Sequence, residues 1–266
     1  TMDTVKLYLK SMAMLLRGQM QYPLSFLLRT LSQLVMEIGE LMALVLLIDR
    51  FDHLNQWTGA DLLFFFGLIS VAFYLTECFG RGVTNFSPLV RSGELDTFLL
   101  RPRGVLTQVL CAAVDPRRLG AIAIGVAALL LSQAQAPVHW TALKILAFAE
   151  AIGFGFVMIL GLFLIEAVLC IRSVKSIEMV NALTYGGRSA CQYPIDVYPL
   201  ALRAIFLLIA PFGMVIHAPA AYILEKPLFG WPTWTAFVCP LMGGVCFGAM
   251  YALFRFALRY YRSTGS

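Results

Sequence analysis

The stretch from Ser87 to Gly104, Ser-Pro-Leu-Val-Arg-Ser-Gly-Glu-Leu-Asp-Thr-Phe-Leu-Leu-Arg-Pro-Arg-Gly, carries five charged side chains between two long apolar segments. These flanking segments, 60–82 and 119–136, have the length at which ~20 mostly apolar residues cross a bilayer as a helix. A segment as polar as 87–104 does not enter the hydrocarbon region, so it must lie at one membrane surface. The rest of the fold is arranged around it.

The composition of the whole chain is that of a protein embedded in lipid. Hydrophobic residues make up 60% of it and charged residues 13%, and the mean hydropathy is +0.80. In soluble globular proteins roughly a quarter of the residues are charged. The sequence therefore predicts an all-α integral membrane protein, formed by a single domain over residues 1–266.

Six segments are predicted to span the membrane: 24–48, 60–82, 119–136, 141–170, 200–220 and 234–257. An even number of spans places both termini on the same side. With both termini in the cytoplasm, nearly all lysines and arginines lie on the inner side, and only Arg50, Lys144 and Lys226 lie outside, as the positive-inside rule requires. This asymmetry accounts for the formal net charge of +5 without nucleic acid.

The six spans form three consecutive pairs, at 24–82, 119–170 and 200–257, and the remaining segments lie before, between and after these pairs. Residues 1–22 carry Lys6, Lys10 and Arg17 among apolar residues and predict an interfacial helix in contact with membrane lipid. Three segments are expected in the cytoplasm: the region 83–118, a linker at 171–199 and a tail at 258–266.

Prolines cluster between the outer half of span five and the start of span six, at positions 211, 219, 227 and 232. Because proline interrupts a helix, we predict broken or re-entrant helices there. Pro211, His217 and Pro219 are candidate outer-gate residues, although a hairpin with a structural role alone is equally consistent with this pattern.

The polar insert is itself amphipathic. Its sequence predicts a short helix that ends at Pro102. An apolar stripe along this helix includes Leu95, Phe98 and Leu99. The charged residues Arg91, Glu94 and Asp96 lie on its other faces. A short helix of this kind, parallel to the membrane, suits docking into a groove on a partner protein. The alternative is a helix that lies on lipid.

Several carboxylates fall within the predicted spans: Glu37 and Glu40 one turn apart in span one, Glu77 near the inner end of span two, and Glu150 and Glu166 in span four. A charge at the bilayer centre costs ~2.5–3.5 kcal/mol, so these groups must face protein or water. They either pair with Arg29 or a neighbouring subunit's cation, or line a translocation path; Glu37, Glu40, Glu77 and Glu166 are the candidates for the path.

Motifs for catalysis on this chain are missing from the sequence. It contains no G-x-x-x-x-G-K-[ST] phosphate loop, no G-x-S-x-G and no H-E-x-x-H, and its histidines show no metal-ligand spacing. We therefore expect no catalytic residue, no resident metal and no cofactor. Two functions stay open at this point: an ion-coupled carrier or channel that acts alone, and an intramembrane enzyme using Glu37, Glu40 or the outer histidines.

The element from Arg91 to Pro102, Arg-Ser-Gly-Glu-Leu-Asp-Thr-Phe-Leu-Leu-Arg-Pro, resembles the signature of six-span permease subunits of type-2 ATP-binding-cassette exporters. It is most similar to the bacterial branch related to daunorubicin-resistance permeases. Weaker similarities follow in the same order as in the family, at 115–120, 192–195, 209–212, 218–220 and 258–263.

The resemblance implies a complex in the bacterial cytoplasmic (inner) membrane with two cytoplasmic ATPase subunits, which bind ATP and Mg, and a second permease subunit, either a related chain or another copy. Helix 91–102 would be the coupling helix. Leu95, Phe98 and Leu99 would fill an apolar groove on the ATPase, while Pro102 would fix the exit angle. Charge pairing would set the register through Arg91, Glu94, Asp96 and Arg101.

Overall fold

The computed structural model describes residues 2–50, 56–172, 177–228 and 230–261, and these ranges fold into helices without a strand. The α-helices are α1 (Met2–Gln19), α2 (Pro23–Arg50), α3 (Gly59–Phe79), α4 (Arg81–Thr84), α5 (Phe86–Arg91), α6 (Glu94–Leu100), α7 (Val105–Ala112), α8 (Arg118–Gln135), α9 (Ala142–Arg172), α10 (Ile177–Ala190), α11 (Leu200–Ala204), α12 (Ala218–Ile223), α13 (Thr235–Val238) and α14 (Leu241–Leu258). A 3₁₀ turn, η2 (Ile195–Val197), and two π-helical segments, η3 (Ile205–Ile209) and η4 (Gly213–His217), complete the order.

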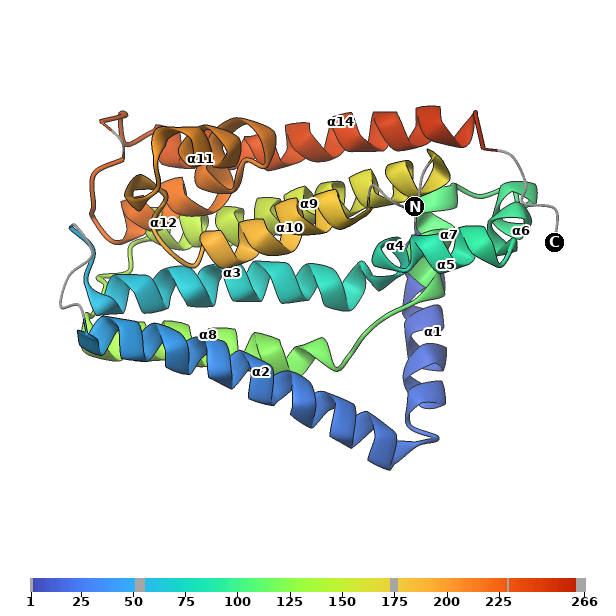
Figure 1. The fold of residues 1–266 in the computed structure, drawn as a ribbon, viewed down its shortest axis with the longest axis horizontal. Helices are drawn as coiled ribbons and strands as arrows, with labels where there is room; N and C mark the ends of the chain where they lie inside the picture. The colour runs from blue at the N-terminus through green and yellow to red at the C-terminus, as the bar shows by residue number, and fades with distance from the viewer. Residues whose placement is uncertain (1, 51–55, 173–176, 229, 262–266) are drawn as a thin grey trace.

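Five helical segments in the described part of the chain are long and apolar enough to cross a membrane: α2, α3, α8, α9 up to Cys170, and Thr235–Leu258. They confirm five of the predicted spans. A bent pair, Leu200–Ile209 with Gly213–Ile223, brings the number of candidates to six. The long helices run side by side along the bundle (Figure 1).

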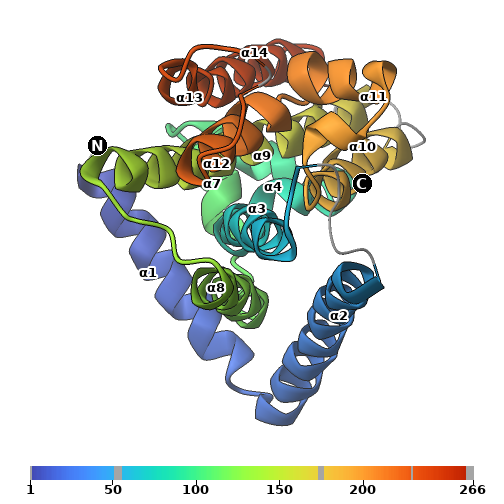
Figure 2. The same ribbon diagram turned by 90° about the vertical axis from the view of Figure 1, so that its left-hand side faces the viewer.

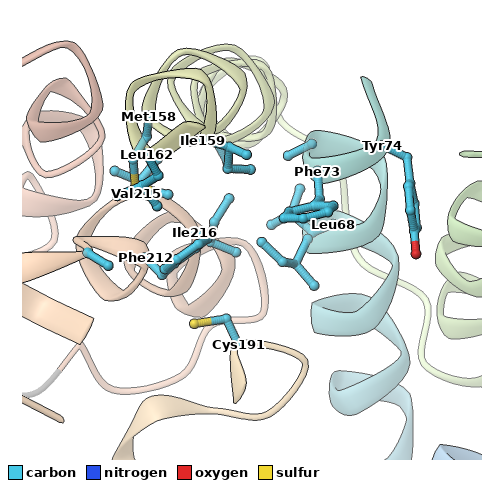
Figure 3. Packing of buried hydrophobic residues seen from close by; sticks show 14 of the residues in the cluster. Leu68, Phe73, Tyr74, Met158, Ile159, Leu162, Cys191, Phe212, Val215 and Ile216 are labelled. Carbon is cyan, nitrogen blue, oxygen red and sulfur yellow. The ribbon is translucent and has the colours of Figure 1, made fainter. Parts of the chain in front are cut away.

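Helix α3 forms the centre of the bundle. It packs against α8 and α9, and α14 covers α9 in turn (Figure 2). The helix begins at a capping box, in which the Thr58 backbone N–H donates to Asp61 Oδ2 at 2.8 Å and the Thr58 hydroxyl accepts from the Asp61 N–H. In Figure 3, Leu68 and Phe73 face Ile159 and Ile216 from neighbouring segments, whereas Tyr74 points to the opposite side of α3. Helix α3 is therefore in contact on nearly every face.

The structure adds a helix to one predicted connecting segment. Residues 171–199 were expected to form a linker, but they contain α10, which packs along α9 and α3. The chain then continues to Asp196, which accepts a hydrogen bond from Trp57 Nε1 at 2.9 Å, just before the start of α3. The segment after α10 thus reaches the end of the bundle opposite to α4–α7 (Figure 1).

The predicted span 200–220 forms a helix pair over 200–223 that is bent by 84°. The bend lies at Pro211, which has no N–H to donate, and the flanking π-helical segments accommodate it. Lys226, beyond the second arm, donates to the Gln56 carbonyl at 2.9 Å, near the start of α3. The predicted broken helix is confirmed, and its break lies within the predicted fifth span.

The opposite end of the bundle holds α1 and the short helices α4–α7. Helix α1 lies across the long helices rather than along them (Figure 1), and its Tyr8 hydroxyl donates to the Phe79 carbonyl at 2.8 Å. The last turns of α14 reach the same end, where Phe254 packs edge-on against Phe86 with ring centroids 5.5 Å apart. The crosswise α1 has the position expected of the predicted interfacial helix.

One close backbone contact holds α4 against α7. A Cβ added at Gly82 would overlap the carbonyl oxygen of Val109, so Gly82→Ala would force two backbones apart. We expect this substitution to destabilise the protein by about 2–3 kcal/mol and to lower its thermal unfolding temperature. The matched control is Gly248→Ala, where a Cβ would meet nothing within 4 Å. Equal unfolding temperatures for the two variants would contradict this packing.

Candidate functional site

The segment between α3 and α8 is folded firmly onto the bundle. The chain turns between α5 and α6 at Gly93, whose φ of 71° favours glycine. Leu95 of α6 and Val109 of α7 are both 0% exposed and belong to the main hydrophobic core. The Gln108 amide donates to the carbonyls of Phe98 at 2.9 Å and Arg103 at 3.0 Å. These contacts fix the position of the loop that follows α6.

The most exposed part of this segment is the C-terminal end of α6 and the residues that follow it. Leu100 is 87% exposed and Leu99 is 43% exposed, and Arg101 and Pro102 beside them are also exposed. Arg91 and Glu94 are exposed as well, on the preceding turn. The result is a small apolar surface flanked by charge.

Two of the three residues predicted to fill a groove on the ATPase, Leu95 and Phe98, pack within this chain instead. Leu95 is buried in the core of this chain and is not available to a partner, while Phe98 is half-buried against the same core. Asp96 is half-buried beside Tyr261, which follows α14. Gly93 breaks the single helix that the sequence predicted, so the apolar stripe divides into an inward part and the exposed Leu99–Leu100 pair. Leu100, to which the sequence assigned no role, is the most exposed leucine of the segment.

A first ion-pair cluster lies where α3 ends and α8 begins. Glu77 is fully buried, and its carboxylate accepts from Tyr185 Oη at 2.7 Å and pairs with Arg118 Nε at 3.0 Å. Asp115 accepts two hydrogen bonds from Arg117, at 2.6 and 2.7 Å. Glu77 was a candidate for the translocation path, but its enclosure between α3, α8 and α10 favours a structural role.

Asp115 provides a test of this cluster. Burial would raise the pKa of its carboxyl, but the hydrogen bonds and charge of Arg117, together with Arg81 and Arg118, outweigh burial and lower it. A lowered pKa stabilises the fold above the unfolded value of ~3.9, and this stabilisation is lost as pH falls through the folded value.

We therefore expect Asp115→Asn to cost about 1–2 kcal/mol at pH 7. Thermal unfolding followed from pH 7 to pH 3 should show the wild type approaching the variant below about pH 4. A difference that stays constant across this range would contradict the ionic role of Asp115.

A second cluster joins α2 to α10. Arg188 Nη2 lies 3.0 Å from Glu37 Oε2 and 2.8 Å from Glu40 Oε2, and the side chains of Arg188 and Glu37 are 6% and 4% exposed. Gln192 donates to Glu40 at 3.0 Å, and the Tyr74 hydroxyl donates to Glu37. The Arg188 guanidinium also sits over the Tyr74 ring, 4.7 Å from its centroid. Here the structure brings together Glu37 and Glu40, two of the four candidates for the path.

Arg29, one of the cations considered as a partner for these glutamates, does not pair with them in the described part of the chain. Arg29 is exposed on α2. The cation that pairs with Glu37 and Glu40 is Arg188, in the segment predicted to be a cytoplasmic linker. A signal for α10 was present in the sequence, since Thr184, Arg188 and Gln192 recur every four residues on one helical face. Glu166 lies half-buried on α9, outside both clusters.

The outer-gate candidates Pro211, His217 and Pro219 are all buried within the bent helix pair. His217 stacks on Phe65 with ring centroids 5.1 Å apart, and its Nδ1 accepts from the Ile195 N–H at 3.3 Å. In this structure the bent pair is therefore packed onto the start of α3. Within the described ranges, no three His, Cys, Asp or Glu side chains are grouped so that they could hold a metal ion.

Comparison with known proteins identifies the chain at the level of its family. A family model described as ABC-2 family transporter protein matches residues 34–265, which include most of α2 and every later helix. No curated protein and no solved structure shows a significant match. The all-helical architecture, the candidate spans and the bent helix pair agree with this family. The chain belongs to the ABC-2 family of transporter proteins, as a multi-pass permease subunit of the type-2 ATP-binding-cassette class.

Proposed function

We propose that this permease subunit moves its substrate out of a bacterial cell, across the cytoplasmic membrane, by work received from separate ATPase subunits. Two ATPase subunits would bind ATP and Mg, and a second permease, either a related chain or another copy, would complete the complex. The family supports this division of labour, since its members are membrane subunits and the chain contains no phosphate loop.

The single observation that carries the proposal is the surface formed by Leu99, Leu100, Arg101 and Pro102. It lies at the end of the bundle where the predicted cytoplasmic side is, and it combines an exposed leucine pair with an adjacent cation. Apolar anchors of this kind supply affinity at protein interfaces, whereas charges at the rim mainly select the partner. We assign Leu99 and Leu100 to the affinity, and Arg91, Glu94 and Arg101 to partner choice.

The connection from this surface to the spans is short and rigid. Leu95 and Val109 anchor α6 and α7 in the core, and α4 packs on both α7 and α9. Arg118 and Glu77 then join the start of α8 to the end of α3. A displacement imposed at Leu100 would therefore move these helix ends together instead of being absorbed by a flexible loop.

Glu40 would lie beside the translocation path or the second permease. Its side chain is 40% exposed, on a helix whose other exposed residues include Met36, Val45 and Leu46. Because a carboxylate in a membrane span is rarely left to lipid, we expect water or a second subunit at this face of α2.

The test is purification of the tagged chain from its native membranes in mild detergent. We expect an ATP-hydrolysing subunit to co-purify at one copy per permease chain, and we expect transport in reconstituted vesicles to stop without ATP. Transport by the purified chain alone, in the absence of nucleotide, would contradict the proposal and favour an ion-coupled carrier or channel.

A further inference from the structure

A cavity of about 350 Å³ lies at the elbow between α1 and α2, lined by Gln19, Tyr22, Ser25, Phe26, Arg29 and Arg117. Two of these residues come from the end of α1 and the turn after it, three from the first turns of α2, and Arg117 immediately precedes α8. In Figure 2, α1 and α2 form a V with α8 between its arms, and α8 also packs against α2.

The polar groups of this cavity suit an anion. Two guanidinium groups, two hydroxyl groups and one amide line it, and no carboxylate does. Arg117 already donates twice to Asp115 and the Gln19 amide donates to the Val114 carbonyl, so Arg29 is the main donor left for a ligand. Arg29 is exposed and makes no ion pair in the described part of the chain. Planar guanidinium groups bind oxyanions of phosphate by paired hydrogen bonds, which gives this donor set a chemical preference.

The surrounding charges leave the cavity positive. Asp115 binds Arg117 and also lies within 4.0 Å of Arg81 and Arg118, and Arg118 in turn pairs with Glu77. Arg81 also interacts with the Glu166 carboxyl on α9, so these three arginines face three carboxylates. Arg29 shares none of these carboxylates, and its positive charge is the excess at the cavity. An anion in the cavity would be attracted to this excess.

The position of the cavity indicates the source of the anion. Its lining residues belong to the elbow after α1, the helix that lies across the spans at one end of the bundle (Figure 1). Leu24 and Leu27 in the first turns of α2 are exposed by 68% and 62%. Phe26 adds an apolar wall. A ligand with a phosphate next to acyl chains matches these neighbours, and a free phosphate ion would use only the polar half.

We propose that the α1–α2 elbow cavity binds the phosphate group of an anionic phospholipid at the inner membrane surface, with Arg29 as the principal ligand. The inference does not depend on the proposed ATPase partnership, because the site lies within this chain. It adds a defined lipid site to the general contact between an interfacial helix and the membrane.

The test compares Arg29→Gln with Arg50→Gln. Both arginines are exposed and lie on α2, at opposite ends of the helix, so both variants lose the same charge. The purified chain is incubated with phosphatidylglycerol or phosphatidylcholine in detergent, and retained lipid is counted by native mass spectrometry. We expect Arg29→Gln to weaken phosphatidylglycerol retention about fivefold, since one cation at a membrane surface contributes ~1 kcal/mol, and Arg50→Gln to leave it unchanged.

Inorganic phosphate distinguishes the two sources of the anion. If millimolar phosphate displaces no phosphatidylglycerol from the wild type, while Arg29→Gln still weakens lipid retention, the lipid assignment is supported. If phosphate binds with the same dependence on Arg29 and phosphatidylglycerol does not, the lipid assignment is overturned in favour of a free-anion site. Equal phosphatidylglycerol retention by Arg29→Gln and Arg50→Gln, with both variants folded, would overturn the site itself.

Discussion

Replacement of Arg188 by methionine is expected to destabilise the protein by about 3–5 kcal/mol, because it leaves the buried Glu37 carboxylate without its cation. Glu37 is 3% exposed, and hydrogen bonds from Tyr74 and Gln33 are all that would remain to stabilise its charge. Glu40 contributes less to this cost, since its side chain is partly exposed. Unfolding of the purified protein by a denaturing detergent gives the free energy of unfolding.

A second substitution shows how much of this loss comes from the unpaired charge and how much from the packing of the methionine side chain. In the double variant Arg188→Met with Glu37→Gln, no buried charge is left unpaired, so most of the lost stability should return. Arg255→Met on the exposed face of α14 is the matched control and should cost less than about 0.5 kcal/mol. If the effects of Arg188→Met and Glu37→Gln simply add, the cluster is not a coupled pair.

Leu100→Glu is expected to weaken the complex with the ATPase by about 30-fold or more, without unfolding the permease. Truncation of an apolar anchor at an interface costs ~2 kcal/mol or more, and a charge placed in an apolar groove adds to that cost. At 87% exposure, Leu100 contributes little to the stability of the isolated chain. Co-purification of tagged permease with the ATPase measures the effect directly.

Two comparisons make this result specific. Leu200→Glu changes a residue of similar exposure, 80%, at the opposite end of the bundle and should leave the complex intact. Leu95→Ala should lower the free energy of unfolding by about 2–5 kcal/mol because Leu95 is part of the core. If Leu100→Glu and Leu200→Glu retained the same amount of ATPase, the exposed end of α6 would not be the docking surface.

The sequence could predict the helices that present apolar residues to lipid. α2, α8, α9 and α14 are recognised by hydropathy, and so is α3, although it is buried by the other helices. Helix α10 was missed because Thr184, Tyr185 and Arg188 make it polar, and their partners lie on α2, α3 and α10 itself. Hydropathy counts such groups as if they faced lipid, whereas in the folded chain they bond to other groups of the protein.

Only part of the candidate docking surface on α6 could be predicted from the sequence. Helical periodicity shows that α6 has an apolar face, but it cannot tell whether that face packs on the core of the same chain or on a partner. Leu95 and Leu99 therefore looked equivalent in sequence, and only the turn at Gly93 and the packing of α7 separate them. The partners of Glu37 and Glu40 lie about 150 positions away in sequence, at Arg188 and Gln192, beyond the reach of any local pattern.

Cross-linking can show whether this permease contacts an ATPase at the end of α6. A photoreactive phenylalanine is placed at position 100, or at position 200 as the control, and the intact complex is irradiated. We expect an adduct between permease and ATPase from position 100 and none from position 200. An intact complex that yields no adduct from position 100, or one that cross-links from position 200 instead, would contradict this expectation.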